Sequence, residues 1–382
     1  MLVITALVVL SQLYAAIPLL APVGAALGGS ATFALSTVYG LCYALGFLLW
    51  GPIADRYGRR RVMITGLVCL AATTFGCGLA SSLPLLAVLR GAQGLMASSL
   101  PPVGLAYLSE AVAPKRRATA IGAMSTAFLV AGIVGQVGAQ AVAEQLGWNW
   151  VFFGSACLLV ACMLSITLLV RESDRASSPG GLSQQFLTIV QLLSRGDVLF
   201  LCAAHLTLLL SFVAMYTALG MHLTALGHDP ETVFALRLTG LPGMFVALAA
   251  GPLTRRLGGA SGLARTGFLI AALGLLLEAL ASGSLTGLGV TSLVFVTGIG
   301  LTVPAMITLF GQASAPRQGS GMAVNGFVLF IGASIGPVLA TTGPSFTVLL
   351  LVIALLLGIS ATFVTLSARA ADPTTARNPR KS

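Results

Sequence analysis

Residues 51–61 read GPIADRYGRRR and place one aspartate and four arginines between two long apolar stretches of the chain. Charged residues make up only 8% of the 382-residue sequence, so this concentration of charge needs a reason. Apolar residues make up 57%, and the mean hydropathy of +0.99 exceeds that of a soluble globular protein of this length. The composition therefore indicates a membrane protein, and the charged stretch is interpreted as a loop between two membrane-spanning helices.

The lengths of the apolar stretches predict helices. Each span requires about 20 mostly apolar residues, because a bilayer core is roughly 30 Å thick and a helix rises about 1.5 Å per residue. The stretches are too long and too uniformly apolar for β-barrel strands, which alternate over about ten residues. We therefore expect an all-α membrane protein with 12 transmembrane helices. They are predicted near residues 3–25, 32–52, 62–81, 83–107, 118–142, 149–170, 198–221, 232–253, 262–282, 286–310, 320–341 and 345–367.

The basic residues predict the orientation of these helices. Lys and Arg number 20 against 10 acidic residues, a balance that would suggest nucleic-acid binding in a soluble protein. If residues 51–61 are cytoplasmic, 18 of the 20 fall in cytoplasmic segments, as the positive-inside rule requires. We expect an inner-membrane protein with both termini in the cytoplasm and no nucleic-acid partner. The first apolar run lacks a basic leader and continues through Pro18 and Pro22, so we interpret it as a retained helix.

Neither the cysteines nor any nucleotide-binding motif indicates a cofactor. The six cysteines all fall inside predicted spans, without disulfide or zinc-site spacing, and are interpreted as small apolar residues. No Walker motif is present, so ATP is not the expected energy source. We predict no cofactor and no metal site.

A long polar break and an internal repeat divide the chain in two. The break begins with RESDRASSPGG at residue 171 and is followed by a weakly amphipathic segment. It predicts an N-terminal six-helix half at 1–170, a cytoplasmic linker at 171–197, a C-terminal six-helix half at 198–368 and a cytoplasmic tail at 369–382. GPLTRRLGG at 251–259 repeats the opening motif. Two parallel halves around a central site are typical of a transporter.

Two motifs carry a resemblance to a known family. GPIADRYGRRR resembles the signature between the second and third helices of the major facilitator superfamily, Gly-x-x-x-Asp-Arg-x-Gly-Arg-[Lys/Arg]. RGAQGLMASSLPPVGLAYLSE at 90–110 resembles the fourth-helix motif of that superfamily. The order and spacing of the motifs resemble the bacterial drug and sugar efflux branch, whose members are mostly proton antiporters.

The resemblance implies a secondary active transporter and not an enzyme. It implies export of a small organic molecule, a drug or metabolite, by rocker-switch alternating access with proton coupling. The expected partners are the small-molecule substrate, protons and the lipid bilayer, and the expected state is a monomer. An uptake symporter or facilitator for a sugar or organic acid is the alternative. A membrane enzyme or receptor is disfavoured, since the sequence predicts neither a catalytic constellation nor a soluble domain.

The same resemblance gives the opening motif a gating role. It implies that Asp55 lies against the start of the eleventh helix, where RQGSGM at 317–322 offers free backbone N–H groups. Arg59 would pair with Glu110 at the inner end of the fourth helix. These contacts would form only when the two halves close on the cytoplasmic side, so they would favour one state of a gate. The alternative is a static surface cluster. The other expected gating residues are Gly51, Arg56 and Gly58.

Three titratable residues inside predicted spans are candidates for proton coupling. Arg90, with Gln93 in the same motif, is either a cavity-lining cation or a buried arginine that caps carbonyls. Glu278 is the only acid well inside a predicted span, and the favoured interpretation is that it pairs with Arg237 at similar depth. His205 titrates near neutral pH or is a packing residue.

The sequence departs from the family pattern in the fifth and first helices. The fifth helix has Gln136 where antiporters of the superfamily commonly have proline, and the expected packing motif instead occurs in the eleventh helix at Gly332, Gly336 and Pro337. The first helix contains no acid, so a carrier without proton coupling remains an alternative. The resemblance implies a cavity lined mainly by the first, fourth, seventh and tenth helices, with Tyr43 and Asn325 on flanking helices. The cavity candidates are Gln12, Tyr14, Tyr43, Gln93, Met96, Met215, Tyr216, Phe295, Met306 and Asn325. Such a lining suits an amphipathic organic molecule.

Overall fold

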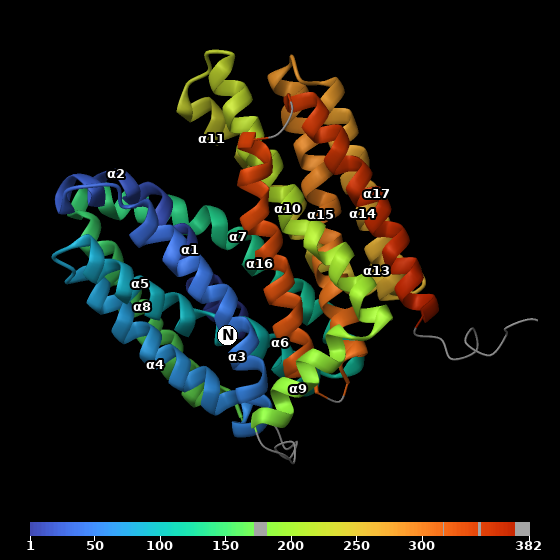
Figure 1. Cartoon of the computed structure of the whole chain (residues 1–382), viewed down its shortest axis with the longest axis horizontal. Helices are drawn as coiled ribbons and strands as arrows, with labels where there is room; N and C mark the ends of the chain where they lie inside the picture. The colour runs from blue at the N-terminus through green and yellow to red at the C-terminus, as the bar shows by residue number, and fades with distance from the viewer. Residues whose placement is uncertain (172–181, 316, 343–344, 371–382) are drawn as a thin grey trace, which may run out of the picture. The chain divides into compact units, whose positions relative to one another are not determined.

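The computed structural model describes residues 1–171, 182–315, 317–342 and 345–370, and every regular element within these ranges is a helix (Figure 1). Residues 172–181 of the predicted linker and 371–382 of the predicted tail lie outside the described residues. The helices are α1 (Leu2–Tyr14), α2 (Ala16–Leu27), the π-helix η1 (Phe33–Thr37), α3 (Val38–Tyr57), α4 (Arg59–Gly78), α5 (Leu83–Ala97), α6 (Leu100–Ala111), α7 (Pro114–Leu146), α8 (Trp148–Leu169), α9 (Leu182–Leu193), α10 (Gly196–Ala225), α11 (Pro230–Leu238), α12 (Leu241–Phe245), the 3-10 helix η2 (Val246–Ala249), α13 (Ala250–Arg256), α14 (Ala260–Leu280), α15 (Leu285–Ala313), α16 (Gln318–Thr342) and α17 (Phe346–Ala370).

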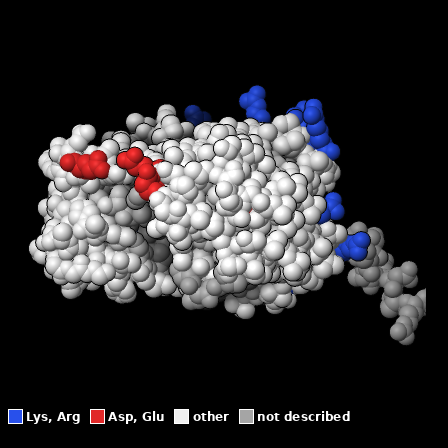
Figure 2. Space-filling view, turned by 90° about the horizontal axis from the view of Figure 1, so that it is seen from above, with Lys and Arg blue, Asp and Glu red and all other residues white. Residues whose placement is uncertain are grey.

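The predicted membrane spans are confirmed. In the described part of the chain, 11 helices are long and apolar enough to cross a membrane, and the bent pair α1 and α2 raises the number to 12. Large apolar side chains are exposed on these helices, among them Leu168 at 81% and Leu280 at 86%. Exposure of that extent on so many apolar side chains fits a surface that faces lipid. Figure 2 shows a face of the molecule on which most of the surface carries no charge.

Three predicted spans are not continuous helices. The first breaks at Ala15, between α1 and α2, with a bend of 43°. Pro18 explains the bend, because it has no N–H to donate to the carbonyl of Tyr14 one turn earlier. The fourth span divides into α5 and α6 before Pro101 and Pro102, which likewise remove two helical donors.

The eighth span is the most broken of the three. The predicted helix at 232–253 consists of α11, α12, η2 and α13 in succession. Gly240 precedes α12 and Pro242 lies in its first turn. The proline cannot donate to the carbonyl of Leu238, and the 3-10 turn that follows gives this span a tighter winding than an α-helix.

The chain forms two compact units that cross the boundary between the sequence halves. Unit 1 comprises Met1–Val112, Ala127–Thr188 and Pro316–Phe327, and unit 2 comprises Ala113–Thr126, Ile189–Ala315 and Val328–Ser382. The first part of α7 therefore belongs to unit 2, and the first part of α16 belongs to unit 1. The fifth and eleventh spans thus each contribute to both units.

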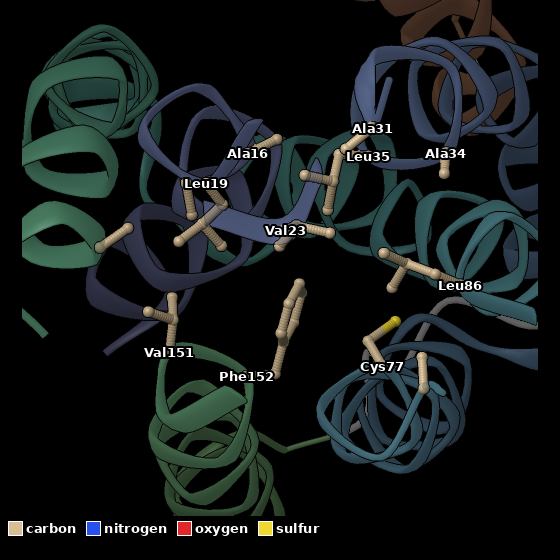
Figure 3. Close-up of a cluster of buried hydrophobic side chains, with 13 residues drawn as sticks. Ala16, Leu19, Val23, Ala31, Ala34, Leu35, Cys77, Leu86, Val151 and Phe152 are labelled. Carbon is tan, nitrogen blue, oxygen red and sulfur yellow. The ribbon is translucent and has the colours of Figure 1, made fainter. Parts of the chain in front are cut away.

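Unit 1 has an apolar core at one end of its helices. Figure 3 shows Phe152 of α8 pointing into a space that Val23 of α2, Leu86 of α5 and Cys77 of α4 surround. Leu35 of the π-helix belongs to the same cluster. These side chains are buried, so close packing between helices holds this end of the unit together.

Candidate functional site

The opening motif forms a buried ion cluster where α3, α4 and α6 meet. Arg59 Nη2 lies 2.6 Å from Asp55 Oδ1 and 2.9 Å from Glu110 Oε1. Arg59 Nη1 also donates to the carbonyl of Ala54 at 2.9 Å. Gly58, between α3 and α4, has a φ of +96°, which a residue with a side chain rarely adopts. This turn places Asp55 and Arg59 together although they belong to different helices.

The first turn of α16 completes the cluster. The Ser320 backbone N–H donates to Asp55 Oδ2 at 3.3 Å, and the Ser109 hydroxyl donates to the side-chain oxygen of Gln318. A Cβ on Gly319 would lie 2.7 Å from the Asp55 carboxyl carbon, so only glycine permits this approach. We call Asp55, Arg59, Glu110 and Ser320 the α3–α16 ion cluster. The contacts that the family resemblance implied are present.

The electrostatics of the ion cluster require all of its members. The Asp55 side chain is 1% exposed and that of Glu110 is 3% exposed, and removing a carboxylate from water costs several kcal/mol. One guanidinium faces two carboxylates, which leaves the three side chains with an excess negative charge. The free N–H groups and positive dipole end of α16 compensate this excess.

The other arginines of the motif have separate partners. Arg56 lies over the ring of Tyr57, 5.6 Å from its centroid. Arg60 donates to the carbonyl of Thr167 on α8 at 2.6 Å. Arg56 was predicted among the gating residues, and its gating role stays a prediction. Gly51 was predicted as well, and it packs on the backbone of Gly319.

Arg90 is the centre of a second buried network. Its Nε donates to the carbonyl of Leu35 at 2.9 Å, its Nη1 to Gln93 Oε1 at 2.6 Å, and both Nη1 and Nη2 to the carbonyl of Gln12 at 3.3 Å. Its guanidinium carbon lies 4.2 Å from the centroid of the Tyr39 ring. Leu35 is in the π-helix and Gln12 lies near the bend between α1 and α2. Arg90 is therefore a buried arginine that caps carbonyls, the alternative that the sequence left open.

The network extends from Gln93 to α4. Gln93 Nε2 donates to Thr74 Oγ1 at 2.8 Å, and the Gln12 side chain donates to the carbonyl of Val8 at 3.1 Å. Thr74 and Tyr39 were not among the predicted residues. No motif marks either residue, and the apolar periodicity of these helices is too weak to show which face they occupy.

The predicted ion pair between Arg237 and Glu278 is wrong. Arg237 Nη2 donates instead to the backbone carbonyl of Tyr216 at 3.4 Å, and Glu278 Oε1 accepts from the Ser292 hydroxyl at 3.2 Å. The reason is helix packing, because α11 and α14 both lie against α15, and Glu278 turns toward Ser292 of that helix. Adjacent positions in the predicted spans indicated similar depth but not which neighbouring helix each side chain faces.

The remaining candidates are distributed over both units. His205 is fully buried on α10, with its ring 5.2 Å from that of Phe310. Gly332 and Gly336 pack closely on the backbone of α10, as helix-packing glycines should, whereas the side chain of Pro337 lies outside the described residues. The cavity candidates in unit 1 are Gln12, Tyr14, Tyr43, Gln93, Met96 and Asn325, and those in unit 2 are Met215, Tyr216, Phe295 and Met306. Their common cavity stays a prediction.

No group of three or more His, Cys, Asp or Glu side chains within the described ranges is placed to hold a metal ion. The functional features are instead a buried ion cluster that joins distant helices and buried polar networks inside membrane spans. Intramembrane ionisable residues of this kind belong to proteins that move ions or solutes. The molecule is therefore of the class of multi-span membrane transporters.

Comparison with known families defines the class further. The model of the Major Facilitator Superfamily matches residues 2–337, so the chain belongs to that superfamily, and it is a multi-pass inner-membrane transporter.

Several proteins named as export or transport proteins share segments of this sequence. The multidrug export protein EmrB of Escherichia coli K12 is 29% identical over 36% of this chain and 27% of its own length. The inner membrane transport protein YnfM of the same organism is 28% identical over 56% of this chain and 52% of its own. A probable actinorhodin transporter of Streptomyces coelicolor is 28% identical over 41% of this chain and 28% of its own. The chain thus spans at most about half the length of these relatives.

Proposed function

We propose that this protein exports a small organic molecule, a drug or metabolite, from the cytoplasm by rocker-switch alternating access, with protons moving in the opposite direction. The names of the relatives support the substrate class, since one is a multidrug export protein and another a probable actinorhodin transporter. The distribution of Lys and Arg supports an orientation with both termini in the cytoplasm. In that orientation the α3–α16 ion cluster lies at the cytoplasmic side of the membrane.

The observation that carries the proposal is the bond between Asp55 and the first turn of α16. The two groups are 265 residues apart in sequence, and they belong to the second and eleventh spans. The buried ion cluster holds these spans together in the present conformation. Opening toward the cytoplasm would separate them and expose the charges to water, so the cluster favours the state that is closed on that side.

Export is tested with the full chain in two settings. Expression in a drug-sensitive bacterial host should lower susceptibility to some members of a panel of amphipathic compounds. Inverted membrane vesicles from the same host should then accumulate such a compound when their interior is made acidic. The control is the same host with an empty vector.

Each result separates the proposal from its alternative. Growth on a new sugar or organic acid, without resistance to any compound, would establish uptake instead of export. Accumulation that does not respond to the imposed pH gradient would remove proton coupling while leaving export in place.

A further inference from the structure

The short helix α9 precedes the long span α10 and differs from the membrane spans (Figure 1). It has 12 residues, which extend about 18 Å and cannot cross a bilayer core of roughly 30 Å. Its apolar and polar residues separate onto different faces more clearly than those of spans such as α17. Such a separation is typical of a helix that lies between an apolar and a polar medium.

One side of α9 is held in a fixed position. Three of its side chains are at most 8% exposed: Thr188, Ile189 and Leu192. Arg317 donates a hydrogen bond to the Thr188 hydroxyl. Just after the helix, Arg195 Nη1 donates to the carbonyl of Ala313 at 2.8 Å. Each of these bonds lies within one compact unit. Together with the buried side chains, they determine where the other faces of α9 point.

A second side of α9 is apolar and exposed. Leu187 is 51% exposed and Val190 is 63% exposed, and Phe186 and Leu193 are half-buried. Because successive residues of a helix are turned by about 100°, these four side chains occupy one arc of its surface. The exposed Gln191 lies outside that arc, about 100° from Val190. We call Phe186, Leu187, Val190 and Leu193 the α9 stripe.

The link between α9 and α10 lies next to a surface that faces lipid. Arg195 has an extended backbone conformation that separates the two helices. Its Nη2 donates to Asp197 Oδ2 at 2.6 Å and its Nε to Asp197 Oδ1 at 3.1 Å, so residues 186–197 carry no net charge. Leu199, in the first turn of α10, is already 50% exposed. The α9 stripe is thus separated from the lipid-facing surface of a span only by one ion pair, as expected at the level of the headgroups.

We propose that the α9 stripe lies in the cytoplasmic leaflet of the bilayer, at the boundary between headgroups and acyl chains. The orientation proposed above makes the start of α10 the cytoplasmic end of its span, which brings α9 to that surface. Burial of the stripe removes apolar side chains from water, while Gln191 on the neighbouring face stays hydrated. Helix α9 then anchors to the membrane the segment that joins the two halves of the sequence.

The size of the stripe favours lipid over a second copy of the chain. A stable protein interface buries about 800 Å² on each partner, and two exposed side chains with two half-buried ones offer far less. Lipid needs no such area, because α9 is covalently joined to a helix that already spans the membrane. No loss of translational freedom therefore opposes its contact with the bilayer.

Tryptophan quenching in the full chain tests the position of the stripe. Val190→Trp and its matched control Gln191→Trp each add one indole at an exposed position of the same helix. In vesicles of phosphatidylcholine brominated near the headgroup, the added emission of Val190→Trp should fall by about half or more, and that of Gln191→Trp by much less. The wild type in the same vesicles gives the background from its three tryptophans.

Two results of the quenching experiment would overturn the proposal. One is emission from Val190→Trp that brominated lipid leaves unchanged, and the other is equal quenching of both variants. Addition of anionic phosphatidylglycerol to the vesicles should have little effect, because residues 186–197 carry no net charge. Quenching that requires the anionic lipid would overturn the proposal in favour of headgroup binding by basic side chains.

A photoactivatable lipid provides a second measurement without any substitution. A phospholipid with a diazirine near its headgroup should label Leu187 and Val190 of the wild-type protein more than Gln191. Crosslinks through α9 between two copies of the chain, without lipid adducts on the stripe, would overturn the proposal. Neither measurement involves transport, so both can support or contradict the lipid contact whether or not the protein is an exporter.

Discussion

Two contacts that correspond in the internal repeat hold their helices by different means. In unit 1, α3 meets the first turn of α16 through Gly51, Gly319 and the charged side chain of Asp55. In unit 2, the equivalent stretch of α13 and the turn before it meet the first part of α7 without any ion pair among the described residues. There Gly251 packs on Thr119, and the Thr126 hydroxyl, which donates to the Gly122 carbonyl of its own helix at 3.0 Å, also lies 3.4 Å from the carbonyl of Met244.

The difference shows what the charged motif adds. Both contacts depend on glycines that let backbones approach closely, so close packing is the shared feature. Only the unit 1 contact buries charges that water would solvate if the helices separated. The free energy of the unit 1 contact therefore changes steeply when the helices separate, whereas that of the neutral unit 2 contact changes through packing alone. We interpret the unit 1 contact as the one that sets the balance between conformational states.

The largest effect is expected from Asp55→Asn. The amide still accepts a hydrogen bond from Ser320, but it loses the charge that pairs with Arg59 at 2.6 Å. A loss of about 2 kcal/mol changes the balance between two states by roughly thirtyfold. Export in vesicles should fall at least tenfold while binding of the exported compound changes little.

The matched control for that variant is Asp229→Asn. Asp229 is an exposed N-cap of α11, and the backbone N–H of Thr232 holds the pKa of its carboxyl below the ordinary value. It is therefore charged at neutral pH, as Asp55 is in the cluster, but it joins no distant helix. Equal export by wild type and Asp55→Asn would show that the ion cluster only anchors the surface.

The sequence was sufficient to predict the ion cluster but not the other networks. Asp55 and Arg59 belong to one family motif and Glu110 ends a second, so the resemblance allowed their partners to be named in advance. Arg90 bonds mainly to backbone carbonyls, and these become available only because α1 bends and a π-turn precedes α3. Neither event is visible in the apolar pattern. The pairing of Arg237 with Glu278 was predicted wrongly because depth along a helix does not fix the facing of a neighbouring residue.

The membrane spans show the same limit. Their existence could be predicted from length and hydropathy alone, and all 12 are accounted for. The positions of the breaks could not be predicted. A proline leaves the carbonyl one turn earlier without a donor, but the packing of neighbouring helices decides whether and where the chain bends. Pro18 thus bends the first span at Ala15, whereas Pro304 lies within the continuous helix α15.

The second largest effect should come from Gly122→Ala, which alters the neutral contact. A Cβ at this position would meet the carbonyl oxygen of Ala247, a backbone atom that cannot rotate away. The helices must separate, which typically costs 1–3 kcal/mol for overpacking of about this size. Thermal unfolding of the purified protein in detergent should show a lower Tm. Gly138→Ala, on the same helix with open space at its Cβ, should leave the Tm unchanged or raise it slightly; an equal decrease in both variants would contradict the packing argument.

A smaller effect is expected from Thr126→Val in the same contact. Valine keeps the shape of threonine but removes the hydroxyl, which bonds to the Gly122 carbonyl of its own helix at 3.0 Å and reaches the Met244 carbonyl at 3.4 Å. A full neutral hydrogen bond contributes about 1 kcal/mol, and the one to Met244 shares its hydrogen, so the Tm should fall by less than in Gly122→Ala. Thr362→Val is the control, since the exposed Thr362 hydroxyl bonds only within its own helix, to the carbonyl of Ile359. A larger decrease than in Gly122→Ala would mean that the hydroxyl, and not close packing, holds α7 in unit 2.

The smallest effect is expected from Arg255→Asp. Arg255 occupies the position in the second repeat that Asp55 occupies in the first, so the substitution restores an acid there. Residue 255 is exposed at the end of α13, and the residue that α13 approaches on α7, Thr119, lies inside that helix and not in its first turn. A carboxylate at this exposed position stays hydrated, and exposed substitutions usually change stability by less than about 0.5 kcal/mol. Export and Tm should both match the wild type. A second outcome is that this variant slows export as strongly as Asp55→Asn. A change of charge at the helix end would then be sufficient to alter export, and the difference between the two contacts would not depend on the helix terminus that receives the acid.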